Sequence, residues 1–148
     1  MKRLLCAGAC LAATALAGCA GGGSTSAPGV SCSLPAGVTN PSLVKPGNGS
    51  TVAAASVQTI YMSTQGGSLA GLSPAWNLIV AEGNAAIAYG SALSPVAAPP
   101  PGITPSASTT FYEASSFPTA FLAGQTVTVF INSATSCNPA PIGTFTTT

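Results

Sequence analysis

Residues 126–131 read Thr-Val-Thr-Val-Phe-Ile, and this stretch decides the fold class. Val127, Val129 and Ile131 recur at every second position, which places them on one face of a β-strand and the residues between them on the other. Residues 76–81 repeat this alternation, beginning with a tryptophan. Strands of this kind bury one face and expose the other, so the pattern predicts sheets that pack on each other around a shared core.

Turn-forming residues divide the rest of the chain into further short segments of strand composition. Clusters of Gly, Pro, Asn and Ser, such as Pro-Gly-Asn-Gly at 46–49, separate runs of β-branched and aromatic residues. A helical period is not evident. We therefore expect an all-β antiparallel sandwich of about seven strands. The expected strands lie at 42–45, 52–64, 76–81, 85–89, 109–114, 126–131 and 143–148.

Two of the connections carry specific signals. Glu82, Gly83 and Asn84 predict a three-residue hairpin turn into 85–89, although the alanines of 85–92 leave a short helix as the alternative. Residues 94–105 read SPVAAPPPGITP. Proline removes backbone donors from a sheet, so this segment predicts a semi-rigid loop or edge crossover with polyproline character.

The end of the chain resembles a known domain family. Residues 122–129, LAGQTVTV, followed by GTFTT at 143–147, look like the last two strands of a fibronectin type III or bacterial immunoglobulin-like domain. Gly124 stands where proline is usual, and Val127 stands where a corner tyrosine would be. Trp76 resembles the core tryptophan of such sandwiches. The resemblance implies an immunoglobulin-like fold of about 100 residues and brings no catalytic residue with it.

The start of the chain has the layout of an export signal. A positively charged Met-Lys-Arg precedes a short apolar run at 4–16, whereas a bilayer span needs about 20 apolar residues. Residues 16–19, Leu-Ala-Gly-Cys, resemble the lipobox of bacterial lipoproteins, in which the cysteine is acylated and becomes the first mature residue. That resemblance implies a lipid such as palmitate on Cys19. A plain secretory signal cut nearby is the alternative.

The lipobox resemblance also predicts location and organisation. Ala20 is not the aspartate that favours inner-membrane retention in enterobacterial lipoproteins, so the resemblance implies the outer membrane, facing the periplasm or the surface, where the host has one. Residues 19–40 begin with a Gly/Ser-rich stretch typical of a flexible tether. We expect a lipoprotein signal peptide at 1–18, the tether at 19–40, and the immunoglobulin-like domain at 41–148.

The cysteines sort by position along the precursor. Cys6 and Cys10 leave with the signal, and Cys19 is the acylation site, which leaves Cys32 and Cys137 in an exported chain. Oxidising compartments favour a disulfide between such a pair, with two free thiols as the alternative. Two cysteines without a histidine supply half of a zinc ligand set, so we expect no metal and no cofactor.

Charged residues make up only 3% of the sequence, and histidine is absent from it. After loss of the signal, Lys45, Glu82 and Glu113 remain, whereas binding nucleic acid requires clustered Lys and Arg. That partner class is excluded. Two-carboxylate catalysis would have to use Glu82 and Glu113, which the strand pattern places in a turn and mid-strand as solvated surface charges. We therefore expect no enzyme.

The aromatic residues raise the remaining functional question. Trp76, Tyr61 and Tyr112 would form a platform for a sugar or a partner if they were exposed together, although strand aromatics in small sandwiches are more often core. The favoured hypothesis is a non-enzymatic, lipid-anchored interaction or structural module of the cell envelope, whose partner is an envelope protein or glycan. The alternative is a carbohydrate- or peptide-binding accessory domain that uses the exposed aromatics.

Overall fold

The computed structural model describes residues 32–83, 89–117, 120–133 and 137–148. The predicted signal peptide, Cys19 and most of the predicted tether lie outside these residues. The described part of the chain contains nine β-strands and one short 3-10 helix: β1 Val38–Lys45, β2 Thr51–Val52, η1 Ala54–Ser56, β3 Thr59–Gly66, β4 Trp76–Glu82, β5 Tyr89–Ala92, β6 Ser94–Val96, β7 Thr109–Ser115, β8 Thr126–Ser133 and β9 Ala140–Thr147.

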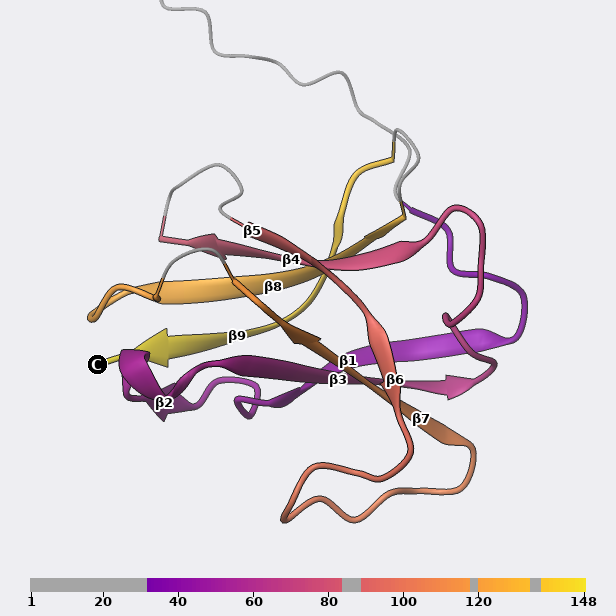
Figure 1. Cartoon of the computed structure of the whole chain (residues 1–148), viewed down its shortest axis with the longest axis horizontal. Coiled ribbons are helices and arrows are strands. Elements are labelled where there is room, and N and C mark those ends of the chain that lie inside the picture. Colours follow the sequence, from indigo (N-terminus) through magenta and orange to yellow (C-terminus); the bar gives the residue numbers. More distant parts are fainter. Residues whose placement is uncertain (1–31, 84–88, 118–119, 134–136) are drawn as a thin grey trace, which may run out of the picture.

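The strands form two sheets that pack face to face, so the expected antiparallel sandwich is confirmed (Figure 1). The first sheet has the order β1-β3-β7-β6, and the second sheet has the order β2-β9-β8-β4-β5. The β2–β9 pair is parallel and the other pairs are antiparallel. Immunoglobulin-like sandwiches have the same division, with strands one, two, five and four of the basic seven in one sheet. The two additional strands, β2 and β5, extend the second sheet at its edges.

The chain changes sheet at both sides of the sandwich. It leaves the first sheet after β1 to form β2, and it leaves the second sheet after β5 to form β6, with only Leu93 between them. β1 contains Pro41, and the edge strand β6 contains Pro95. Short or proline-containing edges resist pairing with another chain, because their backbone donors are few. β6 is therefore the edge crossover that the prolines predicted.

The core uses the faces that the alternation predicted. Val127, Val129 and Ile131 have no exposed surface, and Leu78 and Val80 of β4 are equally buried. They belong to one cluster with the inward residues of the first sheet. Full burial of a side chain of this size contributes about 1.5–3 kcal/mol. Burial between the two sheets is therefore a principal source of stability.

Two strand boundaries near the start differ from those predicted. The first strand begins at Val38, ahead of the expected domain start at 41. The single strand expected at 52–64 is divided by η1, which carries the chain from β2 in the second sheet to β3 in the first. Ser56 stabilises this turn, since its hydroxyl donates to the Ala53 carbonyl at 2.6 Å.

The predicted antiparallel pairing after β4 is confirmed, but the predicted position of Glu82 in the turn is wrong. Glu82 belongs to β4 and not to a turn, and Asn84 lies outside the described residues. Val80 pairs with Tyr89 in antiparallel register. Residues 89–92 form a strand, which rules out a helix there; residues 84–88 lie outside the described part.

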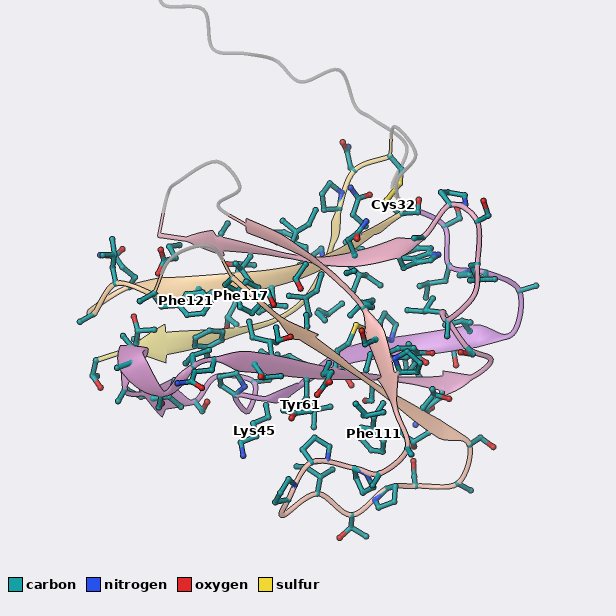
Figure 2. The ribbon with its side chains drawn as sticks, in the orientation of Figure 1. Cys32, Lys45, Tyr61, Phe111, Phe117 and Phe121 are labelled. Atoms are coloured by element: carbon teal, nitrogen blue, oxygen red, sulfur yellow. A yellow bond between two sulfur atoms is a disulfide. The ribbon has the colours of Figure 1, made fainter. Side chains whose placement is uncertain are left out.

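The expected disulfide between Cys32 and Cys137 is present. It joins the segment before β1 to the segment between β8 and β9, so it ties the first sheet to the second at one end (Figure 2). The Asn132 side-chain oxygen lies 2.9 Å from Cys32 Sγ and 3.3 Å from Cys137 Sγ. Cys32 N–H also donates to the Asn138 carbonyl at 3.1 Å.

A threonine stabilises the corner where immunoglobulin-like domains use a tyrosine. Val127, at the position expected for that tyrosine, is a buried core residue. The buried hydroxyl of Thr147 instead donates to the Leu122 carbonyl and accepts from Gln125 N–H at 3.1 Å. Gly124 N–H donates to the Thr147 carbonyl at 2.7 Å. The last strand therefore fixes the entry into β8.

Candidate functional site

Residues 97–108, here called the proline loop, connect β6 to β7 and extend across the outer face of the first sheet (Figure 1). A tight turn shapes its tip, because Ile103 N–H donates to the Pro100 carbonyl at 3.1 Å. Pro101 and Gly102 are the central residues, and Gly102 has φ +86°. Proline followed by a glycine at positive φ is the pattern of a type II turn. The sequence thus dictates the shape of the loop locally.

Phe111 explains how the proline loop sits on the sheet. It alternates along β7 with Tyr112, whose side chain faces the core, so Phe111 points away from the core. Figure 2 shows Phe111 on the same side of the sheet as Lys45 and Tyr61. It is nevertheless only 5% exposed. The proline loop therefore covers an outward-facing aromatic side chain and gains a hydrophobic attachment to the sheet.

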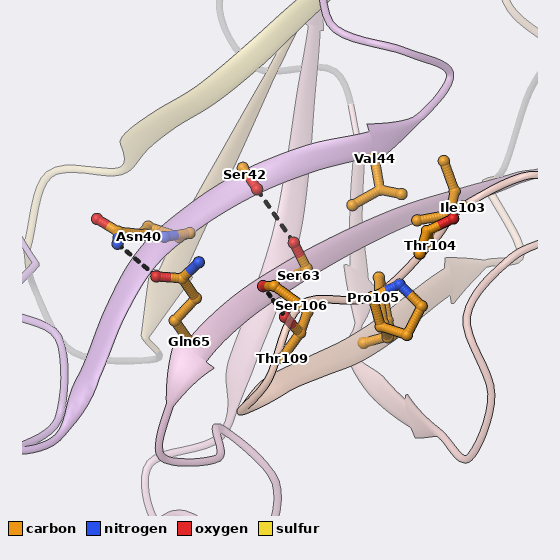
Figure 3. Close-up of a pocket in the computed structure, with 12 residues that line it drawn as sticks. Asn40, Ser42, Val44, Ser63, Gln65, Ile103, Thr104, Pro105, Ser106 and Thr109 are labelled. Atoms are coloured by element: carbon orange, nitrogen blue, oxygen red, sulfur yellow. Dashed lines mark hydrogen bonds between the residues drawn. The ribbon is translucent and has the colours of Figure 1, made fainter.

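A groove of about 410 Å³ lies between the proline loop and strands β1 and β3 (Figure 3). Its apolar surface comes from both walls and from the floor: Pro41, Val44, Ile103, Pro105 and Phe111. Its polar surface comes from Thr104 and from three pairs of side chains, each joined by one hydrogen bond: Asn40 to Gln65 at 2.7 Å, Ser42 to Ser63 at 3.1 Å and Ser106 to Thr109 at 2.8 Å.

The hydrogen bonds within the groove leave capacity for a ligand. An amide side chain has two donor hydrogens and two acceptor sites, and a hydroxyl has one donor and two acceptor sites. The bond within each pair uses one donor hydrogen. The pair therefore keeps both donor and acceptor capacity for a ligand in the groove. Every side chain that lines it in the described structure is uncharged. The groove can therefore bind a neutral polar molecule through side chains.

Two glycines fix the end of the groove at Gln65. Gly66 ends β3 with φ +81°, and a Cβ added there would lie 2.1 Å from the Gly37 carbonyl oxygen. Gly66 N–H donates to Ser108, at the end of the proline loop, at 3.0 Å, and Gly67 N–H donates to Gly37 at 2.7 Å. Close backbone approach therefore positions β1, β3 and the loop together.

The structure does not have the alternative arrangement in which Trp76, Tyr61 and Tyr112 form one exposed platform, and the core position favoured for Trp76 is confirmed. Trp76 is 6% exposed and Tyr112 has no exposed surface, because both side chains face the core between the sheets. The Tyr112 hydroxyl accepts from Leu69 N–H at 2.7 Å, which anchors the β3–β4 connection. Tyr61 alone is half-buried on the outer face of the first sheet. These residues cannot stack together on a ligand.

Within the described residues, the charged side chains occupy two separate regions. Lys45, Tyr61 and Glu113 are cross-strand neighbours over β1, β3 and β7. Glu82 lies in the second sheet, and the expectation that it is a solvated surface charge is wrong. It is only 9% exposed, and its Oε1 accepts from Leu122 N–H at 2.8 Å, so it joins β4 to the chain before β8.

The described residues contain no group of three or more His, Cys, Asp or Glu side chains arranged to hold a metal ion. Among the same residues, no helix is long and apolar enough to span a membrane. Comparisons with protein-family models, with curated proteins and with solved structures find no match.

Sequence reasoning missed the groove, although one signal for it was present. Phe111 and Tyr112 are adjacent in a strand, so one of the two aromatic rings must face outward. The proline-rich segment lies immediately before that strand. An outward aromatic beside a long connection indicates a loop that folds back over a sheet face.

Proposed function

We propose that this chain is a non-enzymatic, lipid-anchored interaction module of the cell envelope, and that the groove is its recognition surface. The observation that carries the proposal is the lining of the groove, which combines uncharged amides and hydroxyls with apolar side chains. Such a lining has hydrogen-bonding and packing capacity and lacks groups that titrate near neutral pH. Binding is the activity that this chemistry supports.

The groove is built on a rigid scaffold, which favours recognition. β3 is paired with β1 on one side and β7 on the other, so its outward side chains have fixed spacing. The type II turn and the contact with Phe111 order the proline loop. A preorganised site loses little conformational entropy when a ligand binds.

The disulfide supports the envelope part of the proposal. The Cys32–Cys137 disulfide belongs to the kind of bond that persists in oxidising compartments outside the cytosol. Lipid on Cys19 would hold the domain to a membrane through the Gly/Ser-rich sequence that precedes Cys32.

The anchor is tested by replacing Cys19 with Ser and fractionating cells. We expect the wild-type protein in the membrane fraction, and the variant either released or left as an unprocessed precursor. A normally processed Cys19→Ser protein that stays in the membrane would contradict lipid anchoring.

The recognition surface is tested by photo-crosslinking in intact cells. A photoreactive residue at Thr104, exposed in the wall of the groove, is compared with one at Thr126, exposed on the outer face of the second sheet. We expect a crosslinked envelope component at Thr104 and not at Thr126. Equal labelling from both positions, or none from Thr104, would refute the assignment of the groove.

A further inference from the structure

We propose that the groove binds an uncharged saccharide chain, an inference that rests on the proposed function and names its ligand class. The first argument is electrostatic. Lys45 and Glu113, the charged residues of the first sheet, do not line the groove, and its described lining is neutral. Acidic or basic ligands need paired charges when they are desolvated. A neutral ligand needs no paired charges.

The second argument concerns the kind of hydrogen-bonding group that the groove offers. β3 is paired with β7 from Thr59 to Gln65 and with β1 on its other side, where β1 bulges between Thr39 and Ser42, so the floor of the groove along β3 offers mainly side chains. An extended peptide binds to a sheet chiefly by backbone pairing at an edge. A saccharide instead presents neighbouring hydroxyls that donate and accept at once. The paired amides Asn40 and Gln65 and the paired hydroxyls Ser42 and Ser63 match that requirement.

The third argument concerns the apolar surface and the size of the groove. Sugar rings have C–H faces as well as hydroxyls, and Val44, Ile103 and Pro105 supply carbon surface beside the polar pairs (Figure 3). The volume of about 410 Å³ falls within the 300–1,000 Å³ that small-molecule sites occupy. The groove therefore has room for a short run of sugar rings lying between the loop and the sheet.

The experiment measures binding to the purified mature lipoprotein in a zwitterionic detergent, which avoids sugar head groups. The probes are the neutral trisaccharides maltotriose, cellotriose, mannotriose, galactotriose and chitotriose. Trigalacturonic acid serves as the charged counterpart, and a capped uncharged Ala-Pro peptide tests the peptide alternative. Saturation-transfer NMR detects weak binding, and calorimetry gives the Kd. We expect binding of at least one neutral trisaccharide and weaker or no binding of the acid and the peptide.

Paired variants locate the site. Asn40→Ala combined with Gln65→Ala removes one amide pair, and we expect the Kd for the bound trisaccharide to rise about tenfold or more. Thr126→Ala combined with Thr146→Ala removes a cross-strand threonine pair from the second sheet and should leave the Kd unchanged. Ser106→Ala gives a single change in the proline loop with the same expected direction. Circular dichroism and Trp76 fluorescence check that each variant is folded.

The outcomes separate this inference from the proposed function. Failure of every neutral trisaccharide to bind, or a Kd that the Asn40 and Gln65 changes leave unaltered, overturns the saccharide assignment. Binding of the peptide in place of the sugars also overturns it. In either case crosslinking of an envelope protein at Thr104 would still support the proposed function, whereas loss of that crosslink would refute both.

Discussion

The outer faces of the two sheets each carry an aromatic side chain, but they differ in how far that side chain is covered. Each has an outward aromatic side chain on an inner strand, Phe111 in the first sheet and Phe130 in the second. Phe130 is half-buried beside its cross-strand neighbour Ile79. Phe111 is 5% exposed because the proline loop lies over it. A single connection between strands thus helps to convert one sheet face into a groove, whereas Phe130 on the other face stays half-buried.

The largest effect on stability is expected from removing the disulfide that joins the two sheets at one end. Replacing Cys32 and Cys137 together with Ala removes a bond between residues 105 positions apart, and on the chain-entropy model we expect a loss of about 4–5 kcal/mol in unfolding free energy. Urea titration followed by Trp76 fluorescence measures it. Reductant should destabilise the wild type and leave the double variant unchanged. A loss below about 1 kcal/mol would show that the core alone holds the sheets together.

The next effect tests the comparison of the two faces directly. Phe111→Ala removes a covered side chain and should cost about 3–4 kcal/mol, because a cavity remains beneath the proline loop. Phe130→Ala removes a half-buried side chain and should cost about 1–2 kcal/mol. Urea titration of both variants gives the difference. Equal costs would mean that the loop adds nothing to the burial of Phe111.

Strand alternation predicted most of the sandwich, because the period of two is local. Val127, Val129 and Ile131 are buried as expected, and Trp76 opens β4 facing the core. The prolines correctly predicted an edge position for 94–96. The division of 52–64 was missed, because a change of sheet depends on partners that lie far away in sequence.

The site was not predictable in the same way. Whether Phe111 or Tyr112 faces outward depends on register, and whether the outward ring is covered depends on the proline loop. Glu82 was expected in solvent because the turn was predicted to begin at Glu82, whereas β4 extends through that residue. Its carboxylate is instead an acceptor for a backbone donor 40 residues further along the chain. Non-local contacts of this kind leave little trace in composition.

A smaller effect is expected where Glu82 accepts the Leu122 N–H. Glu82→Ala leaves that backbone donor without its carboxylate partner and should cost about 1–3 kcal/mol. Glu82→Gln retains an oxygen acceptor and should cost less. Because this contact lies in the second sheet, crosslinking from Thr104 should not change in either variant. A change in crosslinking would show that the groove depends on the second sheet.

The smallest effect on stability is expected at two matched glycines. Substituting them separates a loss of stability from a loss of binding. Gly102 at the tip of the proline loop has φ +86°, and Gly124 before β8 in the second sheet has φ +76°. A Cβ added to either would meet nothing within 4 Å. Alanine at each position should therefore cost about 1–2 kcal/mol for the left-handed backbone alone. Asparagine, which tolerates that conformation, should cost less.

Binding should nevertheless distinguish these two variants. Gly102→Ala strains the turn that sets the position of Ile103 and Pro105, so the wall of the groove moves and crosslinking from Thr104 should weaken. Gly124→Ala strains a turn at the entry to the second sheet, where the proline loop makes no contribution, and crosslinking should persist. Urea titration and crosslinking of the two variants under the same conditions provide the measurement. Equal losses of stability with unequal crosslinking would identify the proline loop as the element that makes one face a binding surface. Equal crosslinking would mean that the strand side chains of the first sheet recognise the partner without it.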